Sequence, residues 1–182
     1  TERLLRYNAD GSWDTTFGVN GIVDMERNNG EFIYHVGVQS DDKIVVCGLE
    51  EKLVNGAFAK FVFVWRFLPN GALDNSFGLN GVAEYTTAEW ANGETYLQIH
   101  DMIVLADNSI LINQTYQGTL GNHVILHKMT ANGAPDASFG TNGDFFKTDP
   151  NYSGVYTYSS SAIQPDGAIV STFTPYDGDL QA

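Results

Sequence analysis

The sequence predicts an all-β protein made of repeated units, each holding four antiparallel strands. First, a ten-residue motif occurs three times, as DTTFGVNGIV (14–23), DNSFGLNGVA (74–83) and DASFGTNGDF (136–145). Second, a block of two apolar runs joined by an Asp-centred turn alternates with it, at 36–46, 102–112 and 161–171. Third, no stretch shows a sustained, capped helical period. Repeated four-stranded units are typical of β-propeller blades, with a solenoid as the alternative.

The strands of one repeat follow from the positions of apolar runs and turns. We expect two strands at 34–39 and 43–48, because the Asp-Asp turn between them suits the positive φ of a tight hairpin. A third strand is expected at 59–67, before an Asn-Gly turn, and a fourth at 81–85, after the motif's final Asn-Gly.

The phase of the repeats predicts how the chain is divided. Residues 1–182 form a single β-propeller segment. In order, it holds half a blade with the third and fourth strands (1–30), two full blades (31–91 and 92–148), and half a blade with the first and second strands (149–182). Propellers usually have four to eight blades, so three repeats do not close a ring. We therefore expect further blades, from a longer chain or from a second copy.

Each residue type in the ten-residue motif has a structural reason to be there. The Asp and the Ser or Thr can bind backbone N–H groups of a tight turn. The Phe can fill the core beneath that turn, and the Gly permits a left-handed or closely packed backbone. We assign these structural roles to Asp14, Phe17, Gly18, Asp74, Phe77, Gly78, Asp136, Phe139 and Gly140.

The two repeated blocks together resemble a known family. The pattern R-x-x-x-x-G-x-x-D-x-S/T-F-G-x-N-G, alternating with I/V-x-x-Q-x-D-G-x-I-x-V, is similar to the delta-60 repeat over nearly the whole chain. The resemblance implies propeller blades in a large bacterial protein that is secreted or attached to the cell surface. An extracellular or cell-surface location is expected on that ground, although TERLLRYNAD shows no signal peptide. The resemblance implies no reaction.

Charge and composition narrow the class of partner. The chain has 22 acidic and 9 basic residues, a net charge of −13, which disfavours nucleic acid and anionic lipid. No apolar run is long enough to insert into a membrane, and a single cysteine, Cys47, allows no intrachain disulfide. We expect the partner to be a protein or a glycan.

Candidate binding residues lie where the repeats differ. The strand nearest the propeller axis carries His35, Asp101 and Ser160 at one equivalent position, and these could form a polar rim. A hydrolase interpretation is weak, because hydrogen bonds among all three are not expected and no G-x-S-x-G elbow is present. In an extended loop, Trp90 and Tyr96 could anchor a protein or sugar. The next candidate is a loop expected at 50–58.

No metal site or other cofactor is expected, and the alternative is a calcium site. His123 and His127 would share one face of a strand about 13 Å apart, too far for one ion. The stretch NADGSWD offers oxygens from Asn8, Asp10, Ser12 and Asp14, but it lacks the residue order of a calcium loop.

These observations favour a non-catalytic interaction or scaffold module, and no catalytic residue is assigned. Whether the chain is an enzyme stays open. One alternative is a hydrolase or lyase at the mouth of the propeller channel. The other is a structural component of a larger secretion or surface assembly.

Overall fold

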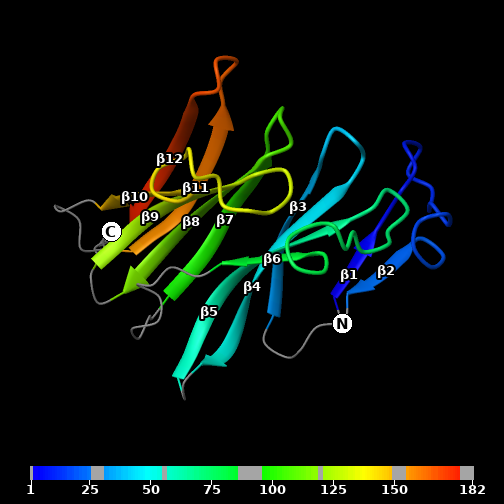
Figure 1. Cartoon of the computed structure of the whole chain (residues 1–182), viewed down its shortest axis with the longest axis horizontal. Helices are drawn as coiled ribbons and strands as arrows, with labels where there is room; N and C mark the ends of the chain where they lie inside the picture. Colours follow the sequence, from blue (N-terminus) through cyan, green and yellow to red (C-terminus); the bar gives the residue numbers. More distant parts are fainter. Residues whose placement is uncertain are drawn as a thin grey trace, which may run out of the picture.

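The computed structural model describes residues 2–25, 31–54, 57–85, 96–118, 121–148 and 155–176. All twelve regular elements in these ranges are β-strands, arranged in a row of sheets with the chain's colour changing from one side to the other (Figure 1). None of the described residues forms a helix long and apolar enough to cross a membrane. The prediction of an all-β fold is confirmed.

Two complete four-stranded antiparallel sheets form the centre of the molecule. The first has the order β3-β4-β5-β6 and the second β7-β8-β9-β10, so each is a simple meander. Their strands are β3 (Glu31–Val38), β4 (Ile44–Val54), β5 (Ala57–Phe67), β6 (Val82–Tyr85), β7 (Tyr96–Val104), β8 (Ile110–Gly118), β9 (Gly121–Met129) and β10 (Asp144–Thr148). This is the blade pattern that the repeats predicted.

A two-stranded sheet lies on each side of the two blades (Figure 1). One pairs β1 (Glu2–Leu5) with β2 (Ile22–Met25), and the other pairs β11 (Val155–Ile163) with β12 (Ile169–Tyr176). By repeat position, β1 and β2 correspond to the outer half of a blade, and β11 and β12 to the inner half. The expected sequence of half blade, two blades and half blade is what the strand order shows.

The hairpin between β4 and β5 is longer than expected. Pairing continues from Ile44 opposite Phe67 to Val54 opposite Ala57, so the prediction of a loop at 50–58 is wrong for residues 50–54 and 57–58, which belong to β4 and β5. Cross-strand charges favour the extension, because Lys60 Nζ lies 3.7 Å from Glu51 Oε1 and Lys52 Nζ lies 2.7 Å from Glu84 Oε2 on β6. Oppositely charged residues thus lie side by side on the strands where a loop was expected.

The ten-residue motif closes a clasp, by which we mean its Asp together with the basic side chain before it and the Ser or Thr after it. In the first blade, Asp74 Oδ1 accepts bonds from the N–H and hydroxyl of Ser76 at 3.1 and 2.6 Å. Its Oδ2 accepts one from Arg66 Nε at 2.9 Å. The same bonds occur around Asp14 (Thr16, Arg6) and Asp136 (Ser138, Lys128).

The Phe and Gly of the motif complete the turn. Phe77 is fully buried, and the Arg66 guanidinium lies 4.7 Å from the centre of its ring. Gly78 has φ of +50°, and an added Cβ would lie 2.1 Å from Val82 O. Only glycine fits this point without moving the backbone.

The hydrophobic core lies between neighbouring blades. Phe63, Trp65 and Phe67 of the first blade pack against Phe17 and Met25 from the first half blade. A second cluster joins the two complete blades, with Val45, Val62 and Val64 on one side and Ile112 and Ile125 on the other. The stability of each blade therefore depends on the next one along.

The second interface contains a polar pair that the first lacks. Trp65 is opposite Val82 in the first blade, whereas His127 is opposite Asp144 at the equivalent position of the second. His127 Nδ1 lies 2.5 Å from Asp144 Oδ1, and its ring stacks on Tyr85 with 3.5 Å between centroids. Burial, and then the charge of Asp144, raise the pKa of Tyr85. At this position the second interface has a polar contact where the first has an apolar one.

We expect Arg66→Ala to destabilise the fold strongly. The Arg66 and Asp74 side chains are only 3% and 8% exposed, so the substitution removes the hydrogen-bonded cation of a buried carboxylate and leaves only Lys43 Nζ, 3.9 Å away, near it. The loss should be about 3–5 kcal/mol in the free energy of unfolding, measured by urea denaturation. The control is Arg3→Ala, which breaks an exposed pair with Asp24 and should cost roughly 0–1 kcal/mol. Equal losses in the two variants would contradict the structural role of the clasp.

Candidate functional site

The inner strands of the sheets lie side by side, where β7 packs against both β3 and β11. Each of the three carries a β-bulge. The pairing register shifts between Ile33 and His35 in β3, between Ile99 and Asp101 in β7, and between Tyr156 and Tyr158 in β11. Bulges re-aim side chains and are frequent beside functional sites. These strands are therefore the first place to look for one.

The structure brings two of the three predicted rim residues into direct contact. Asp101 Oδ2 accepts a bond from the N–H of Ser161 at 3.0 Å, and Ser160 Oγ lies 3.4 Å from the same oxygen. His35 is close enough to Asp101 for that carboxylate to influence its pKa. The three residues thus form a polar row across three sheets, which we call the axial row.

His100 joins the axial row, although no sequence pattern singles it out. It is the bulged residue of β7, and its Nε2 lies 2.7 Å from Thr115 Oγ1. Burial lowers the pKa of His100, and the nearby His35 lowers it further. Burial also lowers the pKa of His35, while the negative charge of Asp101 acts in the opposite direction. Burial thus favours the neutral form of both imidazoles.

The remaining candidates for metal or thiol chemistry are occupied by internal contacts. Asp10 Oδ1 accepts bonds from Ser12, and Asp14 binds Thr16 and Arg6, so both carboxylates of the NADGSWD stretch serve turns. Over the described ranges, no three His, Cys, Asp or Glu side chains gather closely enough to hold a metal ion. Cys47 is buried, which raises the pKa of its thiol to about 12.

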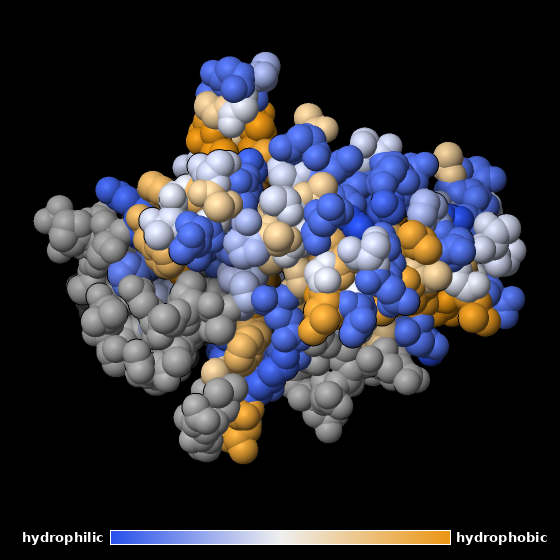
Figure 2. Space-filling model, viewed as in Figure 1, coloured by the Kyte–Doolittle hydropathy of each residue, from blue (hydrophilic) through white to orange (hydrophobic). Residues whose placement is uncertain are grey.

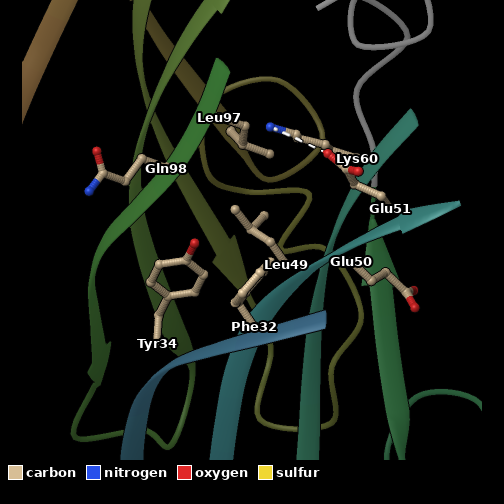
Figure 3. A pocket seen from close by; sticks show the side chains of 8 residues that line it. All are labelled: Phe32, Tyr34, Leu49, Glu50, Glu51, Lys60, Leu97 and Gln98. Atoms are coloured by element: carbon tan, nitrogen blue, oxygen red, sulfur yellow. Dashed lines mark ion pairs between the residues drawn. The ribbon is translucent and has the colours of Figure 1, made fainter. Parts of the chain in front are cut away.

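A pocket opens between β3, β4 and β7, with a volume of about 180 Å³ (Figure 3). Its floor is apolar and consists of the buried Leu49 and Leu97. Phe32 and Tyr34 from β3 also line it, and they are 62% and 41% exposed. The ion pair between Lys60 and Glu51 borders the opposite side, as the dashed line in Figure 3 shows. The pocket thus combines exposed aromatic rings, an apolar floor and a charged rim.

The predicted aromatic anchors lie close to this pocket in the sequence. Trp90 lies outside the described residues, and Tyr96 begins β7 without a described side chain. The residues that follow them, Leu97 and Gln98, line the pocket. The aromatic residues that the structure does place there, Phe32 and Tyr34, were not predicted, because their exposure depends on how three strands from two blades meet.

Asp101→Asn should lower the pKa of His35 further, because it removes the charge that opposes the effect of burial. The His35 and His100 ring protons can be followed by NMR as the pH is varied, and His35→Ala should raise the pKa of His100. Both pKa values lie below 6.5 in the folded protein, so the unfolded chain binds more protons. These two groups therefore lower stability as the pH falls below 6.5. A His35 pKa that rises in Asp101→Asn would contradict this arrangement.

Comparison with known proteins supports a propeller. The chain matches the family model described as "Domain of unknown function (DUF5122) beta-propeller" over residues 2–17 and 39–77. The first range ends at Phe17 and the second at Phe77, so each includes a complete clasp. No curated protein and no solved structure matches the chain. With the two four-stranded sheets, this match shows that the chain folds as β-propeller blades similar to that family.

Proposed function

We propose that this chain is a non-catalytic interaction module whose binding site is the pocket between β3, β4 and β7. This proposal rests on the exposure of Phe32 and Tyr34 beside a charged rim. The side chains of the ten-residue motif, by contrast, bind within their own turns. Aromatic side chains with an apolar body and nearby polar groups are common anchors for protein and sugar ligands. The ligand class is accordingly a protein or a glycan.

The geometry of the pocket supports one small anchoring group. A volume of about 180 Å³ suits a single side chain or a single sugar ring, with further contacts outside. In Figure 3, Tyr34, Leu49 and Leu97 surround one space, while the carboxylate of Glu50 and the amide of Gln98 point away from it. The apolar groups thus bind the anchor, and the Glu51–Lys60 pair orients polar groups at the entrance.

The location proposed for the module is extracellular or on the bacterial cell surface, as part of a delta-60 repeat protein. This finer assignment rests on the repeated motif and its resemblance to that family. The net charge of −13 agrees with a protein that stays soluble without nucleic acid or anionic lipid as a partner. The face shown in Figure 2 is rich in hydrophilic residues, with hydrophobic ones between them.

A second candidate function is an enzyme, a hydrolase or lyase, acting at the axial row. It is favoured by the contact between Ser160 and Asp101, with His35 nearby as a proton acceptor whose neutral form burial favours. A turnover that Asp101→Asn abolishes and Tyr34→Ala leaves intact would support the enzyme over the interaction module.

Binding at the pocket should depend on Tyr34. We expect methyl glycosides of common hexoses, or tripeptides with a central Phe or Tyr, to shift the NMR signals of Leu49, Leu97 and Gln98. Tyr34→Ala should weaken this binding by about tenfold or more, since buried aromatic anchors are often worth 2 kcal/mol or more.

The matched control is Tyr7→Ala, which removes an exposed tyrosine that lies on the first half blade and packs on Trp13. It should leave the affinity unchanged. If both probe classes bind equally well to the wild type and to Tyr34→Ala, the pocket is not the binding site.

A further inference from the structure

The alternation of side chains along β4 divides its two adjacent glutamates between the two faces of the first blade. Leu49 and Glu51 share the face that meets the second blade, because Leu49 belongs to the hydrophobic cluster that joins the two complete blades. Glu50 lies on the other face, and its carboxylate points away from the pocket in Figure 3. The pocket between these two blades thus has one glutamate of β4, Glu51, at its entrance.

The ion pair at the entrance is long. Glu51 and Lys60 are directly opposite each other in the β4–β5 register, yet Lys60 Nζ lies 3.7 Å from Glu51 Oε1, farther than a hydrogen bond reaches. The Glu51 side chain is also 51% exposed. Its carboxylate can therefore accept a hydrogen bond from a ligand without breaking a short bond to Lys60.

Among the described residues just behind the pocket, carboxylates outnumber cations. Lys52 Nζ lies 2.5 Å from Glu50 Oε1 and 2.7 Å from Glu84 Oε2, so one lysine serves two glutamates. A third glutamate, Glu31, is opposite Glu50 in the β3–β4 register. This excess of negative charge favours a cation over an anion at the adjoining pocket.

The aromatic residues of the pocket favour the same sign of charge. Phe32 is opposite Leu49 in the register and therefore shares the pocket face of the sheet with it, and Tyr34 lines the same space. The faces of aromatic rings attract cations. The chain uses this contact within its own fold, with Arg6 at 4.6 Å from the ring centre of Phe17, Arg66 at 4.7 Å from that of Phe77, and Lys52 at 5.0 Å from that of Phe61.

The clasp shows how a ring and a carboxylate together hold a guanidinium. Arg66 lies over the ring of Phe77 and donates from Nε to Asp74 Oδ2 at 2.9 Å. The pocket has the same two parts on an apolar floor, with Tyr34 and Glu51 on opposite sides of Leu49 in Figure 3. A guanidinium from another molecule would complete the arrangement.

We propose that the pocket binds an arginine side chain of a protein partner, with its guanidinium between Tyr34 and Glu51 and its methylene groups on Leu49 and Leu97. This inference rests on the proposed function, whose ligand class it narrows from a protein or glycan to a basic segment of a protein. The net charge of −13 attracts such a segment. All but one of the described Lys and Arg side chains already pair with a carboxylate of this chain, so a second copy is a poor source of the arginine.

The test compares two blocked tripeptides, N-acetyl-Gly-Xaa-Gly-amide with arginine or citrulline at the centre, by titration calorimetry. Citrulline has nearly the shape of arginine without its charge. The arginine peptide should bind about tenfold more tightly to the wild type, and it should shift the NMR signals of Leu49 and Leu97. High salt should reduce the difference between the two peptides, because it screens an exposed ion pair.

Two variants of the entrance pair should change the affinity for the arginine peptide in opposite directions. Glu51→Gln removes the carboxylate that binds the guanidinium and should weaken binding by about three- to fivefold. Lys60→Gln removes a competing cation and should tighten binding by a similar factor. Asp24→Asn and Arg3→Gln are the matched controls, because they remove the same charges from an exposed cross-strand pair on the first half blade. They should leave the affinity unchanged.

Equal binding of the two peptides would overturn the inference, as would equal effects of Glu51→Gln and Asp24→Asn. Tighter binding in Glu51→Gln with weaker binding in Lys60→Gln would also overturn it, because the pocket would then prefer an anion. In these cases the proposed function still holds if the phenylalanine, tyrosine or glycoside probes bind in a way that depends on Tyr34. If no probe of any class shifts the signals of the pocket residues, the proposed function fails together with this inference.

Discussion

A carboxylate held between a cation and a hydroxyl is the interaction on which the rest of this structure depends. In the first blade, Asp74 fixes the turn through Ser76 and at the same time orients Arg66. The oriented guanidinium then has a free N–H with which to reach the next blade at Ala131. Because one group joins the turn, the strand and the neighbouring blade, it combines local turn chemistry with the stacking of the sheets. Arginine suits this double role better than lysine.

The fold could be predicted from the sequence because its determinants are local and repeated. Turn residues, a buried Phe and alternating apolar runs recur in the same order, and each specifies a short piece of backbone. The β4–β5 hairpin was predicted too short, because its outer part is stabilised across strands. The pair of Glu51 with Lys60 and the bond from Lys52 to Glu84 on β6 become visible only once the register is known.

The candidate site was less accessible to sequence reasoning, and the reason is again physical. His35, Asp101 and Ser160 could be named because they differ at an equivalent repeat position, and the structure adds His100 through a bulge that no local pattern marks. Phe32 and Tyr34 read as ordinary strand residues. Their exposure beside Leu97 depends on the meeting of two blades, a contact between residues far apart in the sequence. Local signals thus fixed the scaffold and left the binding surface undetermined.

The pair of buried His127 and partly buried Asp144 has a consequence for how the blades find one another. Repeats with similar sequences risk docking in the wrong order during folding. Tyr85 stacks on His127, whereas Met25, its counterpart on the first half blade, belongs to the apolar cluster around Trp65. If Met25 took the place of Tyr85, the side chains of His127 and Asp144 would face a thioether in place of the phenol ring. The polar pair therefore makes the second interface chemically different from the first, so the blades are not interchangeable.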